Sequence, residues 1–126
     1  MTPQEAKTYL MQYRAIIQKI KERKEQIAEL RKVTAGLPYD ECYTEAVEKM
    51  AILRGELSRE IMELCETNDS IIRTINSVPN SEQQNVLYSR YVLGKTLEQI
   101  AVDMSYHYVS ICRIHGRALA YVANLL

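Results

Sequence analysis

The sequence has no tryptophan, no phenylalanine, and only four glycines and three prolines in 126 residues. It also lacks a long apolar run, since its longest uncharged stretches (104–112 and 118–126) have nine residues each. A membrane-spanning helix needs about 20 apolar residues. The start of the chain has no basic segment followed by an apolar one, which a secretory signal requires. These absences predict a cytoplasmic protein that has no membrane contact.

The chain also has no excess of either charge. Sixteen Lys and Arg balance sixteen Asp and Glu, which argues against a broadly basic protein that coats nucleic acid without specificity. Residues 1–79 carry 12 basic and 13 acidic side chains, and residues 80–126 carry four and three. Any DNA-binding segment in the second part would therefore make few phosphate contacts and bind weakly as one copy.

Signatures of metal binding and catalysis are missing as well. Cys42, Cys65 and Cys112 form no C-x-x-C pair, so we expect reduced thiols. Cys112 and His115 stand one helical turn apart, but no second pair completes the set of about four ligands that a zinc site needs. No glycine-rich phosphate loop and no acid–base dyad can be argued. We predict no metal, no cofactor and no enzymatic activity.

Heptad spacing dominates the first part of the chain. Thr2, Pro3 and Glu5 form a helix start with a capping box, and the helix is predicted over about residues 3–33. The stretch 34–40 breaks it, with Gly36 as a left-handed C-cap. A second heptad series runs from Tyr43 to Val78, with a kink or break as an option in the run of weak helix formers at 67–70.

The short connection makes the two helices antiparallel neighbours. We predict an all-α chain in which residues 1–78 form a long antiparallel helical hairpin, a coiled coil used for oligomerisation or partner docking. Its core residues are predicted to be Tyr13, Ile17, Ile20, Ile27, Met50, Leu57, Ile61, Leu64, Ile71 and Ile75. Arg54 and Asn68 occupy core offsets in the second series, where they either fix register or oligomer state or are exposed by a slight rotation of the helix.

Residues 79–126 form a second domain, in which 96–115 have the spacing of a helix-turn-helix. Ala101 supplies the small residue that a close crossing of two helices needs. The inward offsets hold apolar side chains (Ile100, Met104, Ile111 and Ile114), and Ser105 takes the turn position that is usually glycine. Thr96 can cap the first helix, whereas His107 is a poor cap for the second.

The same segment resembles a known family. Val86-Leu87, Arg90-Tyr91 and the run Gly94 to Ala101, continued by Ile111, Ile114 and Ala118-Leu119, look like region 4 of sigma-70-type RNA polymerase sigma factors. Together with the hairpin, they are most similar to the small sigma-factor-like proteins of phages and prophages. Tyr108, Val109 and Cys112 stand where ordinary sigma factors carry Arg and Glu.

The resemblance implies a transcriptional regulator in a bacterial host cell, which binds double-stranded DNA with RNA polymerase or as a homo-oligomer. The helix from about Tyr108 to Leu119 would enter the major groove. The carried-over candidates for base contact are His107, Tyr108, Val109, Cys112 and Arg113. Those for phosphate contact are Arg90, Lys95, Thr96 and Arg117.

The sequence leaves two other functions possible. One is a protein-interaction module of the transcription machinery that no longer binds DNA. The other is a small subunit of a phage DNA-packaging terminase, which also joins a helix-turn-helix to helical oligomerisation.

Overall fold

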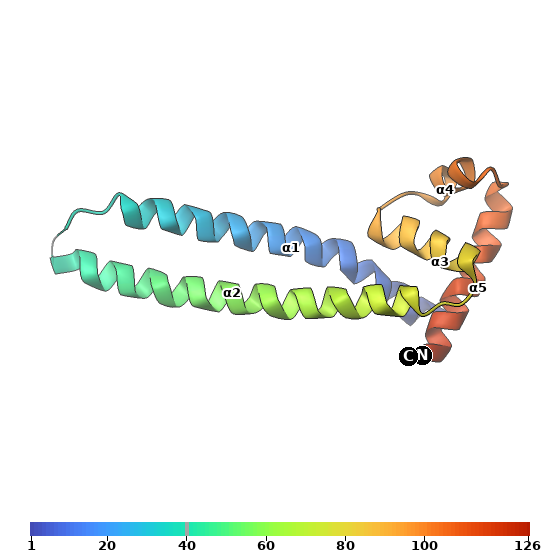
Figure 1. Cartoon of the computed structure of the whole chain (residues 1–126), viewed down its shortest axis with the longest axis horizontal. Helices are drawn as coiled ribbons and strands as arrows, with labels where there is room; N and C mark the ends of the chain where they lie inside the picture. Colours follow the sequence, from blue (N-terminus) through green and yellow to red (C-terminus); the bar gives the residue numbers. More distant parts are fainter. Residues whose placement is uncertain (40) are drawn as a thin grey trace. The chain divides into compact units, whose positions relative to one another are not determined.

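A computed structural model describes residues 1–39 and 41–126, and the side chains of all of these except residue 41. Within this range the chain is all-α, as predicted, with five α-helices and one short π-helix, η1. Their bounds are α1 Pro3–Ala35, α2 Glu41–Asn76, α3 Ser81–Leu87, η1 Tyr88–Val92, α4 Leu97–Met104 and α5 Tyr108–Leu125. Figure 1 shows α1 and α2 as the long antiparallel pair, followed by the shorter helices.

The start of α1 confirms Thr2 as the predicted cap, but in place of the reciprocal bond of a capping box Glu5 Oε1 accepts from Thr2 Oγ1 at 3.1 Å. Thr2 Oγ1 accepts a hydrogen bond from the Glu5 backbone N–H at 3.2 Å, which satisfies one of the free N–H groups of the first turn. The prediction for Gly36 is wrong. Among the described residues only Gly94 and Ser105 have a left-handed backbone, and the Gly36 N–H instead bonds the carbonyls of Lys32 and Val33. Asp40, part of the predicted break, lies outside the described residues.

The chain divides into two compact units. The first joins residues 1–15 to residues 68–126, and the second comprises residues 16–67. Both long helices contribute to both units. The functional boundary at residue 79 stays a prediction.

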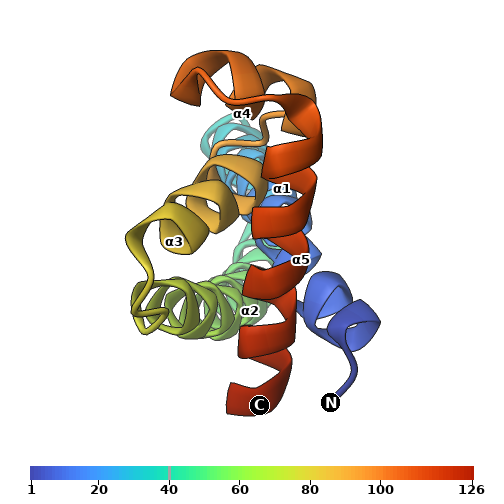
Figure 2. The ribbon, with the colours of Figure 1, turned by 90° about the vertical axis from the view of Figure 1, so that its right-hand side faces the viewer.

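The first unit has a continuous apolar core. The beginning of α1, the end of α2, α3, η1 and α5 all contribute to it, and Figure 2 shows α3 and α4 both lying against α5. Its buried members are Ala6, Leu10, Ile71, Ile75, Val78, Leu87, Tyr91, Val92, Ala118, Leu119, Val122 and Ala123. Burying this many side chains, each contributing on the order of 1–3 kcal/mol, makes this unit the stable part of the chain. Ile71 and Ile75 confirm the core prediction for the end of the hairpin.

Two polar contacts tie α1 to its neighbours in the first unit. The Tyr9 hydroxyl lies 3.0 Å from Ser70 Oγ, and Arg14 Nη1 donates to the Val92 carbonyl at 3.0 Å. Asn68 also belongs here and is only 6% exposed. Neither atom of its side-chain amide has a hydrogen-bond partner among the described residues. The weak helix formers around Asn68 do not interrupt α2, which runs unbroken through them.

The second unit is packed more loosely. Six of the predicted core residues in this unit are half-buried: Ile20, Ile27, Met50, Leu57, Ile61 and Leu64. Tyr13, in the first unit, is half-buried as well. The prediction for Ile17 as core within the chain is wrong, because it is 42% exposed while Ile16 is 7% exposed. Successive residues of an α-helix differ by about 100° in direction, so only one of these two isoleucines can face α2. Arg54 is exposed in the single chain, and its role in an oligomer stays a prediction.

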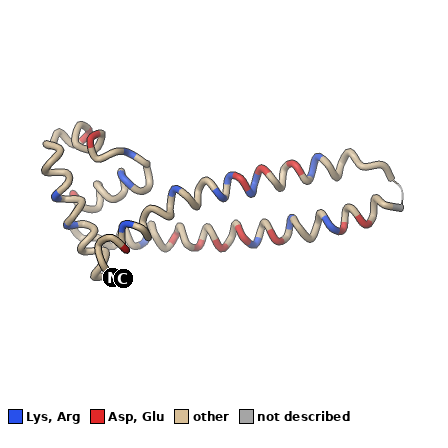
Figure 3. The backbone as a smooth tube through the Cα atoms, turned by 180° about the vertical axis from the view of Figure 1, so that it is seen from behind, with Lys and Arg blue, Asp and Glu red and all other residues tan. Residues whose placement is uncertain are grey.

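Charged residues are dense along α1 and α2 and sparse from α3 to α5, as Figure 3 shows. An ion pair between Arg23 Nε and Glu60 Oε2, at 2.9 Å, links the two long helices inside the second unit. None of the helices in the described ranges has the length and apolar character to cross a bilayer.

Candidate nucleic-acid interface

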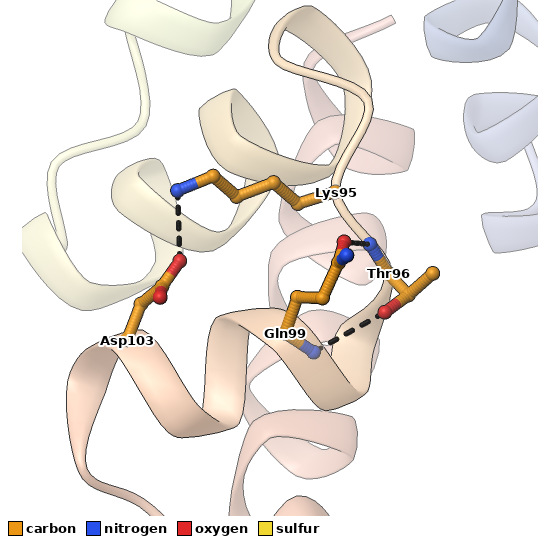
Figure 4. A network of polar contacts seen from close by, with 4 residues as sticks. All are labelled: Lys95, Thr96, Gln99 and Asp103. Carbon is orange, nitrogen blue, oxygen red and sulfur yellow. Dashed lines mark hydrogen bonds and ion pairs between the residues drawn. The ribbon is translucent and has the colours of Figure 1, made fainter.

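The candidate interface is built on α4, the turn after it, and α5. Thr96 begins α4 as its N-cap: its Oγ1 accepts from the Gln99 N–H at 3.2 Å, and its own N–H donates to Gln99 Oε1 at 2.9 Å. Figure 4 shows this reciprocal pair. Two N–H groups at the start of α4 are therefore satisfied, and the cap predicted from the sequence is confirmed.

The turn between α4 and α5 is tight because of one residue. Ser105 has φ 58° and ψ 38°, a left-handed conformation that glycine adopts readily and serine adopts at a cost. The Tyr106 N–H then bonds the Ala101 carbonyl at 2.9 Å. His107 precedes α5 in an extended conformation and makes no side-chain capping bond within the described chain. The sequence located both residues correctly.

A small cluster fixes how α4 lies against α5. Val86 of α3, Ile100 and Ala101 of α4, and Ile111 of α5 are all buried. Ala101 allows the close approach because its side chain is only a methyl group. Partly buried Leu97, Met104 and Ile114 surround the cluster. This set confirms the inward offsets predicted from the spacing, and it holds α5 by one face.

The opposite face of α5 is open. Its exposed residues follow the helical repeat and form what we call the outward stripe: Val109, Arg113, Gly116, Arg117 and Ala120. Val109 is 58% exposed, and Tyr108 at the first position of the helix is 48% exposed. His107 and Arg113 are exposed, and Cys112 is half-buried. Four of the five base-contact candidates are therefore accessible at the N-terminal end of α5.

Tyr108 and Cys112 interact with each other one turn apart. The hydrogen bond to Cys112 raises the pKa of the Tyr108 hydroxyl, with further electrostatic contributions from Cys112 and Glu98. The tyrosine is therefore a neutral phenol at physiological pH. It presents an apolar ring together with a hydroxyl that can donate.

A shallow hollow of about 300 Å³ lies beside the outward stripe. Arg113 and Arg117 line one side of it, together with Ser110 and Ile114, and Glu82 and Tyr106 line the other. The Tyr106 hydroxyl donates to Glu82 Oε1 at 2.6 Å, and this bond raises the pKa of Tyr106. On its α5 side the hollow offers two guanidinium groups and the Ser110 hydroxyl to an anionic ligand, whereas the Glu82 carboxylate on the other side opposes one. The sequence reading missed Ser110, whose helical spacing from Arg113 and Arg117 was the available signal, and Tyr106, which lies in the turn before α5.

The phosphate candidates differ in how available they are. Lys95 Nζ, just before α4, lies 2.7 Å from Asp103 Oδ2 of that helix, as Figure 4 shows, so its charge is partly offset. Arg90 Nη1 donates to the Lys95 carbonyl at 3.1 Å and is half-buried. Thr96 is occupied as a cap. Arg117 is exposed on α5 and is the most accessible of the four.

His115 faces the core rather than the outward stripe. Its Nε2 lies 2.7 Å from the Tyr91 hydroxyl, and the two rings stack with centroids 5.7 Å apart. Burial, with the nearby charges of Lys7 and Arg90, lowers the pKa of His115 to about 4. Burial raises the pKa of Tyr91 to about 12. Both groups are neutral at physiological pH and hold η1 against α5, a role that the sequence did not reveal.

No group of three or more His, Cys, Asp or Glu in the described part of the chain could hold a metal ion. Comparison with known proteins adds no assignment, since no protein-family model, curated protein or solved structure matches the chain.

Proposed function

We propose that this chain is a non-enzymatic, phage-type transcriptional regulator that binds DNA through α5. In this proposal α4, the turn at Ser105 and α5 form a helix-turn-helix like that of sigma factor region 4. The observation that carries it is the outward stripe of α5. It stays open to solvent while the opposite face of the helix is held by Ile111 and the core of the first unit.

The N-terminal end of α5 has the chemistry to read base edges. Arg113 can donate two hydrogen bonds to a guanine, and the Val109 or Tyr108 side chain can contact a thymine methyl. Arg117 and Ser110 beside the hollow are suited to a phosphate. A helix that presents one guanidinium to a base and another to a DNA phosphate can recognise a sequence and also fix its own position on the duplex.

Few cations are available to strengthen this interaction. Residues 80–126 contain four basic side chains, of which Lys95 is paired with Asp103 and Arg90 with a backbone carbonyl. Each phosphate contact contributes to affinity through the release of counterions. One copy therefore binds weakly, and tight binding requires a second copy or contact with RNA polymerase.

The same scarcity of cations favours a second candidate, a protein-interaction module of the transcription machinery. Tyr108 and Val109 would then be apolar contacts to a protein rather than to DNA. The two candidates differ in whether Arg113 and Arg117 matter for binding any duplex.

Selection from a pool of randomised duplexes, followed by gel shifts at low salt, separates them. The regulator should enrich a defined sequence, and Arg113→Ala should weaken the shift of that sequence to the level of a scrambled duplex. The charge-matched control is Arg59→Ala, on an exposed position of α2, which should leave the shift unchanged. If no duplex is enriched and no shift appears at the lowest salt, the DNA-binding function is wrong and the interaction module stands.

A further inference from the structure

Two arginines from distant parts of the chain meet at the loop between η1 and α4, residues 93–96. Arg14 of α1 donates from Nη1 to the Val92 carbonyl at 3.0 Å, at the end of η1. Arg90 of η1 donates from Nη1 to the Lys95 carbonyl at 3.1 Å. Both arginines belong to the first unit, so this loop carries one guanidinium from α1 and one from η1.

Neither guanidinium is paired with a carboxylate among the described residues, whose salt bridges lie elsewhere. Each carbonyl bond uses one of the five N–H donors of an arginine and leaves its charge in place. The Asp103 carboxylate beside the loop is held by Lys95. Arg14 is exposed, and its guanidinium lies against Gly94, where an added Cβ would be 3.2 Å from the guanidinium carbon. Arg14 is therefore an accessible cation whose position is fixed by the loop.

The loop lies along one flank of α5. Tyr108 and His115 are two helical turns apart and share this flank. The charges of Lys7 and Arg90 act on His115, and Glu98 of α4 acts on Tyr108. A duplex that receives α5 in its major groove has a phosphate strand along each flank of the helix. Around this flank four cations meet two carboxylates: Lys7, Arg14, Arg90 and Lys95 against Glu98 and Asp103.

We infer that Arg14 binds a phosphate of the duplex strand beside this flank, so that α1 takes part in DNA binding together with α5. The inference rests on the proposed function and extends it, because it adds a cation from α1 to those of residues 80–126. A guanidinium can give a phosphate two parallel N–H bonds. The bond to the Val92 carbonyl already orders the long side chain, which lowers the entropy that binding costs.

The salt dependence of duplex binding by Arg14→Gln, in the full chain, tests this contact. Glutamine removes the charge but keeps an N–H donor. The slope of log affinity against log salt should fall by about 1, and the dissociation constant at about 0.1 M salt should rise about fivefold to tenfold, for the selected and a scrambled duplex alike. Arg14→Lys keeps the charge and should retain the wild-type slope, which a purely structural role of Arg14 would not predict. Arg31→Gln, exposed on α1 outside the first unit, is the charge-matched control and should leave the slope unaltered.

A second variant adds a charge without removing either arginine. Leu93 in the loop is 48% exposed, and Leu93→Lys should steepen the slope by about 1. Val33→Lys, at a 43% exposed position of α1 outside the first unit, adds the same charge and should not. An unchanged slope for a folded Arg14→Gln overturns the inference while the proposed function stands. If circular dichroism shows that Arg14→Gln has lost helix, Leu93→Lys decides in the same way. A wild type that shifts no duplex overturns both.

Discussion

The Tyr91 hydroxyl and His115 Nε2 lie 2.7 Å apart in a partly buried contact of the first unit. The histidine belongs to α5 and the tyrosine to η1, so this bond links the proposed reading helix to the segment before α4. The pKa of His115 is lowered to about 4, mainly by burial. Protonation of this ring would place a charge in a half-buried site near the charges of Lys7 and Arg90, which disfavours the folded state.

Stability should therefore fall as the pH is lowered. In the unfolded chain His115 has its ordinary pKa of 6.5, so between 6.5 and about 4 the unfolded state binds more protons than the folded state. From about pH 7 to pH 5 we expect a loss of about 1–2 kcal/mol that is specific to this group. Urea unfolding of wild type and His115→Gln at both pH values measures it. The glutamine variant should lose less, and equal losses would contradict the assignment.

Asn68 should be a site where substitution stabilises the fold. Its buried amide has no hydrogen-bond partner among the described residues, and an unsatisfied buried polar group costs about 1–3 kcal/mol. Asn68→Leu should raise the free energy of unfolding by a similar amount, measured by urea denaturation. Asn85→Leu, at an exposed position, should change it by less than about 0.5 kcal/mol. A destabilised Asn68→Leu would mean that the amide has a partner after all.

Gly94 should not tolerate a side chain. Its φ is +74°, and an added Cβ would lie 3.2 Å from the Arg14 guanidinium carbon, so the Arg14–Val92 hydrogen bond would be disturbed as well. Gly94→Ala should cost about 1–2 kcal/mol. Gly55→Ala is the contrast, since nothing lies within 4 Å of its added Cβ and alanine favours the helix by about 1 kcal/mol. Thermal unfolding of both variants should give shifts of opposite sign, and two shifts of the same sign would contradict this reading.

Asp103 should limit DNA binding by holding Lys95. Asp103→Asn removes the partner at 2.7 Å and frees the ammonium for a phosphate, while costing at most about 1 kcal/mol of stability. DNA affinity should rise, and the slope of log affinity against log salt should steepen by about 1. Asp69→Asn, an exposed position on α2, makes the same change in net charge and should leave the slope unaltered. An unchanged slope for Asp103→Asn would show that Lys95 does not reach DNA.

Local rules in the sequence were enough to predict the helices, the caps at Thr2 and Thr96, and the turn at Ser105. Each depends on residues within four positions of one another. The sequence could not show which of Ile16 and Ile17 is buried, because both fit the heptad spacing approximately and tertiary packing decides between them. The Tyr91–His115 bond and the Lys95–Asp103 pair join separate elements, and the sequence contains no signal for either distance.

Gly36 and η1 show that local sequence rules also fail to predict parts of the backbone conformation. A glycine after a helix favours a left-handed cap, yet the chain leaves α1 without one. The π-helix depends on how Tyr91 and Val92 enter the core, which no local pattern encodes. The outward stripe of α5 was predicted in part, since its spacing follows from the helix, but its exposure depends on the cluster around Ala101.

The salt dependence of duplex binding, measured by fluorescence anisotropy on the selected sequence and on a scrambled one, tests the DNA-binding proposal most directly. Arg117→Ala should weaken both duplexes equally and lower the slope by about 1, as loss of one phosphate contact requires. Arg113→Ala should instead abolish the preference for the selected sequence while the slope stays nearly constant. If both variants bind both duplexes as the wild type does, α5 is not the DNA-reading helix.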